Sequence, residues 1–262
     1  MRWIMALSDG DGNPEQAVAA ERYYTFALRA LRSAWAQGVA LHPVVLFNGE
    51  PNSFTTYLHQ LGVSVLFHRP SFNALLHGHA QVRGLGWLRT AKGAYLRLCL
   101  PELFSGTVLY TDADIMFTGN LQNLPTHCGG LAVAPEFELD NFKDFNSGVM
   151  LMNLDVLRPH WPAFMRWTLE HLLEVPNFDQ GALKWCFRGR HESLNPIFNW
   201  KPYWGVNPLA QIVHFHGPKP PDFYHQSSDP RALSPEHVTH RLWRQSPQGY
   251  AHYVNAWFQL KA

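Results

Sequence analysis

Val108-Leu109-Tyr110-Thr111-Asp112-Ala113-Asp114-Ile115-Met116-Phe117 is the most informative stretch of this chain. An apolar run, which we expect to form a strand, leads into two aspartates separated by one residue. Open α/β folds bind ligands at the carboxyl ends of their strands, so this pair places hard oxygen ligands at such an edge. Two buried carboxylates are costly without a cation. The alternative is an acidic loop or a helix cap, which explains most isolated Asp-x-Asp pairs.

The remainder of the chain predicts an α/β fold, because short apolar runs alternate with helical patterns. The predicted strands cover residues 3–7, 44–47, 63–67, 108–110, 131–134, 149–152 and 212–215. A helix is predicted from an apolar stripe that packs on the sheet, namely Tyr24, Ala27, Leu28, Leu31 and Trp35. Further helices are predicted over 90–103 and 164–173, and the Gly- and His-rich stretch 71–88 is predicted to be irregular.

Length and composition favour one domain over residues 1–262, with 46% hydrophobic and 16% charged residues. The last quarter is rich in proline and aromatic residues, which predicts loops and short helices over one edge of the sheet. Three widely spaced cysteines, Cys99, Cys128 and Cys186, are expected to be reduced residues of the core.

The charge and the apolar segments limit the partners of the protein. A formal net charge of +1 provides no field that would attract nucleic acid. The apolar run at the start is too short for a signal peptide, no segment has the length of a membrane span, and there is no Asn-x-Ser/Thr motif. We therefore expect a cytoplasmic protein without a transmembrane segment, for which peripheral membrane contact stays open.

A second feature lies about a hundred residues later, at Ile212-Val213-His214-Phe215-His216-Gly217-Pro218-Lys219-Pro220. A strand that ends in an imidazole, followed by a glycine and a cation, suits a metal-bound diphosphate. His214 could complete the metal's ligands, and Lys219 could act as a point charge for phosphates. A structural histidine is the more common explanation for either ring, and alternation places His216 on the same side as His214.

Two polar segments lie between these features, Phe145-Asn146-Ser147-Gly148 and Asn177-Phe178-Asp179-Gln180-Gly181. Their amide and carboxylate groups suit hydrogen bonds to sugar hydroxyls. The alternatives are a turn before a strand for Asn146 to Gly148, and a helix N-cap for Asp179 and Gln180.

The four segments, in this order and spacing, resemble glycosyltransferase family 8, which includes glycogenin and bacterial lipooligosaccharide galactosyltransferases. The similarity runs from about Ala94 to Pro220. It implies a GT-A type nucleotide-diphospho-sugar transferase fold, with a central mixed, mostly parallel sheet flanked by helices. It also implies a retaining enzyme that transfers a hexose from a UDP-sugar to a glycan, a lipid-linked saccharide or a protein.

The resemblance also assigns roles to residues. Asp112, Asp114 and His214 would bind Mn²⁺, with Mg²⁺ as a weaker substitute. The nucleotide sugar would contact Leu7, Ser8, Arg97, Ala113, Asn146, Ser147, Gly217 and Lys219 together with the two aspartates. Asp179, Gln180 and Asn146 would be the catalytic group near the reacting carbon. The family's His-x-x-Gly-x-x-Lys-Pro-Trp is one residue shorter here, and Pro221 replaces the Trp.

Acceptor contacts are expected from the aromatic stretch 198–204 and from Trp185, although packing at the edge of the core explains these rings equally well. Two other functions stay open. A nucleotidyltransferase would show a glycine-rich loop with basic residues near the start, where Gly10 and Gly12 stand without Lys or Arg. A non-catalytic carbohydrate-binding protein would not need Asp112, Asp114 and Lys219 together.

Overall fold

The computed structural model describes residues 1–9, 14–223, 231 and 233–260, and the chain divides into two compact units. Unit 1 comprises Met1–Thr25, Leu41–Ala113 and Pro125–Leu194, and unit 2 comprises Phe26–Ala40, Asp114–Leu124 and Asn195–Ala262. The prediction of a single catalytic domain over 1–262 stays a prediction. Gly10 and Gly12 of the nucleotidyltransferase alternative lie outside the described residues.

Unit 1 is built on a seven-stranded sheet of order β3-β2-β1-β4-β7-β6-β8. Its strands are β1 (Arg2–Ser8), β2 (His42–Asn48), β3 (Ser64–Phe67), β4 (Thr107–Thr111), β6 (Leu131–Pro135), β7 (Phe145–Asn153) and β8 (Glu192–Ser193). All pairings are parallel except the two that β7 makes with β4 and β6. The predicted mixed, mostly parallel sheet is thereby confirmed.

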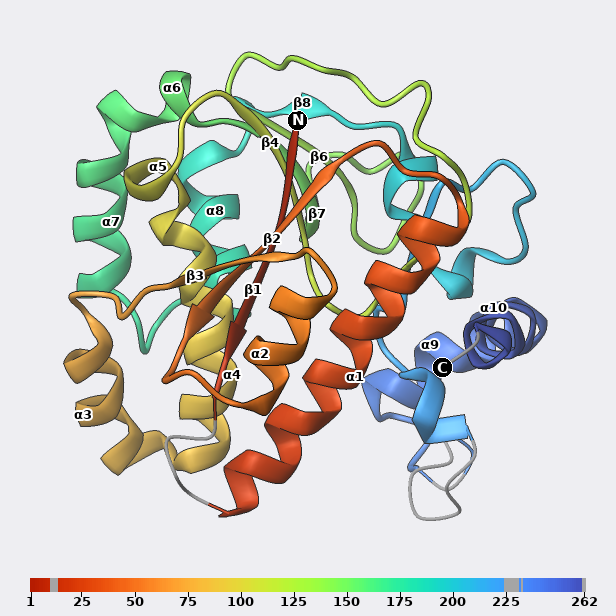
Figure 1. Cartoon of the computed structure of the whole chain (residues 1–262), viewed down its shortest axis with the longest axis horizontal. Coiled ribbons are helices and arrows are strands. Elements are labelled where there is room, and N and C mark those ends of the chain that lie inside the picture. Colours follow the sequence, from red (N-terminus) through yellow and green to blue (C-terminus); the bar gives the residue numbers. More distant parts are fainter. Residues whose placement is uncertain (10–13, 224–230, 232, 261–262) are drawn as a thin grey trace. The chain divides into compact units, whose positions relative to one another are not determined.

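Helices gather on one face of this sheet, as Figure 1 shows for α4, α7 and α8. Alternate strand residues such as Ile4, Val108 and Met150 point into this layer, because successive side chains of a strand face opposite ways. The helices of unit 1 are α2 (Ser53–Gln60), α3 (Asn73–Arg83), α4 (Leu85–Leu96), α5 (Leu100–Leu103), α6 (Leu154–Leu157), α7 (Trp161–Glu170) and α8 (Phe178–Phe187).

The long helix α1 (Pro14–Ala36) begins in unit 1 and ends in unit 2. Its predicted stripe holds at Ala27 and Leu31, which are fully buried, and at Tyr24, whose ring stacks on Phe54 with centroids 4.1 Å apart. The last member of the stripe was wrong, because Trp35 is 43% exposed at the end of the helix.

The prediction that residues 71–88 are irregular was wrong. Residues 73–83 form α3, and α4 begins at Leu85. Gly84, which adopts a φ of 85°, is the hinge between the two helices. The helical pattern was hidden because only Leu76 of α3 is buried, so the segment carries almost no apolar stripe.

The helix predicted over 90–103 is present, with an interruption that has a local cause. A 3₁₀ turn at Arg97–Cys99 separates α4 from α5, and Pro101 follows it. Proline has no N–H to donate to the carbonyl of Arg97, so the α-helical ladder breaks there. The break turns the Arg97 side chain inward, where it is 7% exposed.

Unit 2 contains its own two-stranded antiparallel sheet, β5 (Ile115–Phe117) with β9 (Ile212–His214). Its helices are the second half of α1, α9 (Val238–Gln245) and α10 (Pro247–Gln259). Tyr203, Leu242 and Tyr250 form a small apolar cluster beside these strands and helices. The expected loops and short helices of the last quarter are present, but α10 is longer than expected.

The three cysteines are free thiols, as expected. Burial raises the pKa of Cys99 to about 12, so this thiol is an inert core residue, whereas Cys186 is only half-buried.

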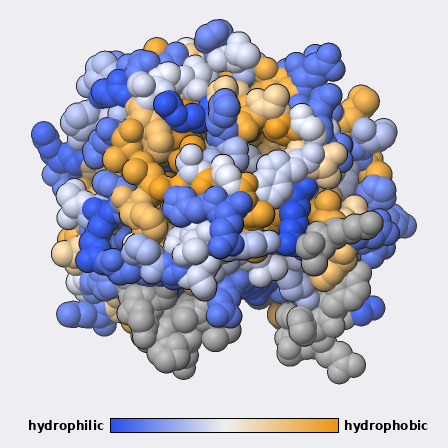
Figure 2. Space-filling view, in the orientation of Figure 1, coloured by the Kyte–Doolittle hydropathy of each residue, from blue (hydrophilic) through white to orange (hydrophobic). Residues whose placement is uncertain are grey.

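Within the part of the chain that the structure describes, no helix is both long and apolar enough to cross a membrane. Figure 2 shows apolar side chains in several separate groups divided by hydrophilic ones on the visible face.

The turn before α8 requires a glycine, which leads to a testable expectation. Asn177 and Phe178 both have positive φ, of 57° and 54°, and fold the chain back on α8. A Cβ on Gly181 would lie 1.9 Å from the carbonyl oxygen of Pro176. Gly181→Ala should therefore lower the free energy of unfolding by about 2 kcal/mol or more.

Gly93→Ala in α4 is the matched control for that substitution. A Cβ at Gly93 meets no atom within 4 Å, so alanine there should stabilise the helix by up to about 1 kcal/mol. Chemical denaturation of both variants measures the difference. Equal stability changes would show that the close approach at Gly181 does not exist.

Candidate functional site

Polar residues of unit 1 collect at one edge of its sheet. β1 and β4 are parallel neighbours, so Ser8, the last residue of β1, and Asp112, which follows β4, lie at the same edge. β6 runs parallel to β4 and leads into Glu136, while β7 is antiparallel and starts here with Asn146 and Ser147. The alternative of a turn at Asn146 to Gly148 was wrong, because these residues lie inside β7.

Arg97 is the centre of this edge. Its guanidinium is 2.8 Å from Asp112 Oδ1 through Nη2 and 3.3 Å from Asp179 Oδ2 through Nε. Nη1 donates to the carbonyl oxygen of Ser147 at 3.1 Å, and the guanidinium lies 4.6 Å from the centre of the Tyr110 ring. One buried cation thus holds both carboxylates and the start of β7 in place.

Asp112 is held by three elements of unit 1. Besides Arg97, it accepts a hydrogen bond from the Tyr110 hydroxyl at 3.0 Å, and its backbone N–H donates to the Gly148 carbonyl at 2.7 Å. The carboxylate side chain is still 27% exposed. It is therefore fixed in position and yet accessible to a ligand.

Asp179 is a buried carboxylate in an unfavourable environment. It is 3% exposed, and its Oδ2 accepts no hydrogen bond from the described residues. Burial raises the pKa of Asp179 to about 6, because the loss of solvation and the Asp112 charge outweigh the opposite effect of Arg97. The N-cap alternative was wrong, since Asn177 holds that position and Asp179 faces inward from the first turn of α8.

Gln180 lies beside it, and both ends of its carboxamide bind protein groups. Its Oε1 accepts from Asn146 Nδ2 at 3.0 Å and from the Ser147 N–H at 2.9 Å. Its Nε2 donates to Glu136 Oε1 at 2.9 Å. Unit 1 therefore brings together most of the predicted catalytic and sugar-binding residues, namely Arg97, Asp112, Asn146, Ser147, Asp179 and Gln180.

The residues at the end of β1 differ in exposure and in their contacts. Leu7 is 3% exposed, so its side chain belongs to the core, and Ser8 is partly exposed. Asp9 forms a 3.3 Å ion pair with Lys92, a fully buried residue of α4. The roles predicted for Leu7 and Ser8 stay predictions. Ala113 closes this segment of unit 1 and is 5% exposed.

Unit 2 holds a second cluster, around Asp114. The His214 Nε2 lies 3.5 Å from Asp114 Oδ1, and the Lys219 ammonium binds Asp114 Oδ2 and the Phe215 carbonyl oxygen. Asp114 is 6% exposed. Burial raises the pKa of this carboxyl, but Lys219 and His214 outweigh that effect and hold it well below its usual value.

The orientation of His214 follows from its other neighbour. His214 Nδ1 lies 3.1 Å from Oδ1 of Asn199, which is fully buried. Asn199 therefore orients the imidazole so that Nε2 faces Asp114 Oδ1. An imidazole nitrogen and a carboxylate oxygen that face one another are the kinds of atoms that bind a metal ion.

His216 and Gly217 have structural surroundings. The Tyr203 hydroxyl lies 3.1 Å from His216 Nδ1, which ties this ring to the aromatic stretch. Gly217 adopts a φ of 92°, and a Cβ there would meet Leu242 Cδ1 at 2.8 Å. The glycine thus allows the turn that returns Lys219 to Asp114.

The aromatic residues predicted to contact the acceptor differ in how exposed they are. Phe198, Trp200 and Tyr203 are buried in unit 2, so core packing explains these three rings. Trp185 of unit 1 is 71% exposed and stacks on Trp167 with the ring planes 3° apart. An acceptor role for these rings stays a prediction.

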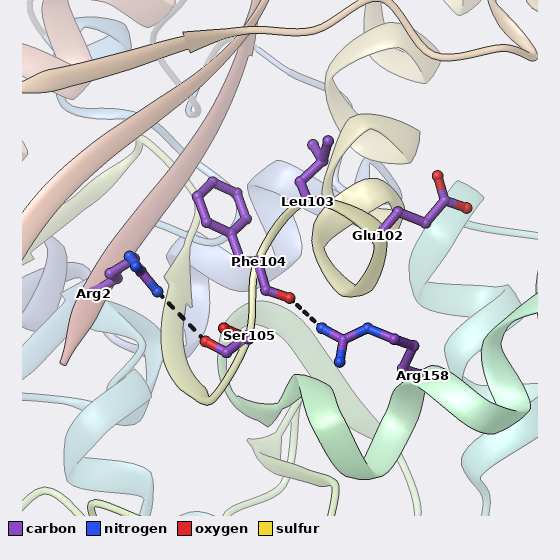
Figure 3. Close-up of a pocket in the computed structure, with 6 residues that line it drawn as sticks. All are labelled: Arg2, Glu102, Leu103, Phe104, Ser105 and Arg158. Carbon is purple, nitrogen blue, oxygen red and sulfur yellow. Dashed lines mark hydrogen bonds between the residues drawn. The ribbon is translucent and has the colours of Figure 1, made fainter.

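A pocket of about 350 Å³ lies at the opposite edge of the unit 1 sheet, beside the starts of β1 and β4. Figure 3 shows that its two guanidinium groups point at backbone carbonyls. Arg158 donates to Pro101 O and Phe104 O, and Arg2 donates to Ser105 O. These cations fasten the loop before β4, so the structure gives both of them a role in holding the chain.

Reasoning from the sequence missed several residues that shape these clusters. Glu136 and Lys184 contact Gln180 or its partner, and Asn199 orients His214. Glu136 follows an apolar strand directly, as Asp112 does, and this pattern could have indicated it. Asn199 and Lys184 stand in no such pattern.

Comparison with known proteins gives a likeness at the level of structure. No protein-family model matches the chain, and no curated sequence matches it. The galactosyltransferase LgtC, crystallised with donor and acceptor sugar analogs, superposes with a TM-score of 0.63 at 20% identity, over 94% of this chain and 95% of LgtC.

The glycosyltransferase GlyE of Streptococcus pneumoniae TIGR4 superposes with a TM-score of 0.61 at 19% identity over 98% of this chain. The chain spans 63% of the length of GlyE. Mouse xyloside xylosyltransferase 1 gives a TM-score of 0.53 at 16% identity over 81% of this chain. The predicted GT-A type fold of glycosyltransferases is thereby confirmed, and so is the resemblance to these enzymes at the level of the fold.

Proposed function

We propose that this chain is a metal-dependent, retaining glycosyltransferase that moves a hexose from a UDP-sugar to a carbohydrate or glycoconjugate acceptor. The observation that carries the proposal is the cluster of Asp114, His214 and Lys219, in which the imidazole Nε2 and a carboxylate oxygen face one another at 3.5 Å. The nucleotide and the hexose come from the resemblance to family 8. The cytoplasmic location stays a prediction from the sequence.

The residues present fit a divalent cation. Asp114 and His214 supply a carboxylate oxygen and an imidazole nitrogen that already lie 3.5 Å apart. Asp112 stands two residues earlier in the chain, with an accessible carboxylate, and we propose that it completes the set. Two carboxylates with one imidazole suit Mn²⁺, and Mg²⁺ should bind more weakly.

Lys219 has a role that changes with the ligand. Its ammonium group now neutralises Asp114. A bound Mn²⁺ would take over that charge and would stabilise the diphosphate of the departing nucleotide. Lys219 would then be released to pair with a phosphate oxygen, which stabilises the negative charge that forms as the glycosidic bond breaks.

Asp179 and Gln180, at the edge of the unit 1 sheet, are suited to contact the sugar during the transfer reaction. The anomeric carbon becomes oxocarbenium-like as the nucleotide leaves, and a negative oxygen nearby stabilises that positive charge. Asp179 Oδ2 lies 3.3 Å from Arg97 Nε and accepts no hydrogen bond from the described residues, whereas Oε1 of Gln180 accepts three, from Asn146 and from the N–H and hydroxyl of Ser147. We therefore propose Asp179 for that role, with Asn146 and Gln180 binding and orienting the sugar.

The experiment is a thermal-shift assay with UDP, with and without Mn²⁺, followed by hydrolysis of UDP-hexoses. A ligand at about 100 times its Kd raises the free energy of unfolding by about 2.7 kcal/mol, so a shift that needs both UDP and Mn²⁺ supports the proposal. ADP and EDTA are the controls. Binding of free sugars without any nucleotide effect would favour a non-catalytic carbohydrate-binding protein and overturn the proposal.

A further inference from the structure

The carboxamide of Gln180 is held in one orientation by partners that differ in kind. The Ser147 N–H can only donate, so it must meet the oxygen of the carboxamide. The Glu136 carboxylate, which is paired with the Lys184 ammonium group, accepts, so it meets the nitrogen. Asn146 Nδ2 adds a second donor to the oxygen. The donors at Oε1 and the acceptor at Nε2 thus select the same orientation, and among the described residues Glu136 is the acceptor that holds Nε2.

Glu136 is itself held firmly. It is 4% exposed directly after β6, and its backbone N–H donates to the Asp144 carbonyl at 2.7 Å. Its second oxygen is bound by the ammonium group of Lys184, which also binds Asp144. Lys184 lies four residues after Gln180, so both side chains leave α8 on the same face.

We propose that Glu136 is a positioning residue for the transfer reaction, which acts by fixing the carboxamide of Gln180. The inference rests on the proposed function, and it adds a residue that no sequence motif indicated. With Oε1 occupied, Gln180 offers a ligand the second N–H of Nε2. It therefore acts as a hydrogen-bond donor to a hydroxyl of the bound sugar.

Glu136→Gln tests this proposal with almost no change of shape. The Lys184 ammonium can only donate, so it takes the new carbonyl oxygen and leaves the new NH₂ opposite Gln180 Nε2. Two donors then face each other, so Gln180 Nε2 loses this acceptor and the carboxamide is held less firmly, through its oxygen. We expect kcat for UDP-hexose turnover to fall on the order of 10- to 100-fold, with KM for the donor within about threefold.

Rescue by a second substitution separates positioning from general stability. In Glu136→Gln with Lys184→Met, the carbonyl oxygen of the introduced carboxamide is no longer claimed and can turn to Gln180 Nε2. We expect kcat to recover to within about threefold of Lys184→Met alone. The double variant should nevertheless have a lower Tm than Glu136→Gln, because another ion pair is lost. Asp144→Asn is the control, since the Asp144 side chain is 42% exposed and binds Lys184 from the solvent-exposed side of that ammonium group.

A second readout does not depend on turnover. The side-chain ¹⁵N–¹H₂ signals of Gln180 should show two widely separated protons in the wild type, because one donates to a carboxylate. Glu136→Gln should reduce that separation, and the double variant should restore it. A wild type with this signature but no UDP-hexose turnover would overturn the proposed function. Unchanged signals or unchanged kcat in Glu136→Gln, in an active protein, would overturn the positioning role.

Discussion

Replacing Asp114 with alanine is expected to lower kcat for UDP-hexose turnover by roughly 100- to 1,000-fold, because it removes a ligand of the proposed cation. The Mn²⁺-dependent part of the UDP thermal shift should disappear with it. Lys219 would keep its bond to the Phe215 carbonyl but would lose its carboxylate partner, so the free energy of unfolding should also fall by about 1 to 3 kcal/mol.

Asp114→Asn separates these two effects. It keeps an oxygen for Lys219 and the shape of the side chain, so it should be more stable than the alanine variant. Asp114→Asn loses the negative charge, so the Mn²⁺-dependent part of its UDP thermal shift should be as weak as in the alanine variant. Asp155→Asn, a half-exposed position at the other edge of the unit 1 sheet, is the control and should retain full turnover. Wild-type kcat in Asp114→Ala would rule out the metal role.

Replacing Asp179 with asparagine is expected to lower kcat by roughly 100-fold or more while making the apo protein more stable at pH 7. The loss of turnover follows from the loss of the negative oxygen that we place near the anomeric carbon. The gain in stability follows from burial, because the ionised carboxyl is 3% exposed and its pKa is raised from 3.8 to about 6. A neutral amide avoids the cost of a buried charge.

The sign of the pH dependence follows from the same shift. The native state binds the Asp179 proton more tightly than the unfolded chain does, so ionisation between pH 4 and 6 costs stability as the pH rises. A shift of this size corresponds to at most about 3 kcal/mol, fully lost above the folded pKa of about 6. Asp179→Asn lacks this loss, so its advantage should be near zero at pH 4 and greatest above pH 6.

Urea denaturation at pH 4.0, 5.0, 6.0 and 7.5 in EDTA measures this difference between variant and wild type. EDTA matters because a bound cation would change the charge beside Asp112. A variant that is less stable than the wild type at pH 7.5 would show that the ion pair with Arg97 outweighs burial. In that case Asp179 would be a structural partner of Arg97 rather than a strained functional group.

Particular elements show what sequence patterns predict well. Strands β1 and β4 carry dense apolar runs and lie where the sequence placed them, whereas β7 begins at Phe145, before the predicted start at residue 149. Helix α3 was missed because its single buried residue, Leu76, leaves no stripe to detect. To predict the break at Arg97–Cys99, one has to know which backbone carbonyl Pro101 leaves without a hydrogen-bond donor. Periodicity records burial, so an element with little burial is invisible to it.

The residues of the candidate site divide in the same way, into those that sequence patterns predicted and those that they missed. Asp112 and Asp114 were predicted because their chemistry and spacing are unusual within the sequence itself, and His214 was predicted from the resemblance to family 8, since alternation alone did not separate it from His216. Glu136, Lys184 and Asn199 were missed, because each acts through a contact between residues 15 or more positions apart. The pKa of Asp179 likewise depends on burial and on Arg97, which lies on another element.

The sequence by itself determined the α/β class and predicted the sheet edge at which the proposed ligands stand, because both follow from local runs of apolar and carboxylate residues. Only the tertiary structure decided which way those groups point. Gln180 turns its nitrogen to Glu136, and His214 turns Nε2 to Asp114, because each side chain also has a partner far away in the chain that orients it. Hydrogen-bond direction is a property of pairs, and the pairs are made by folding.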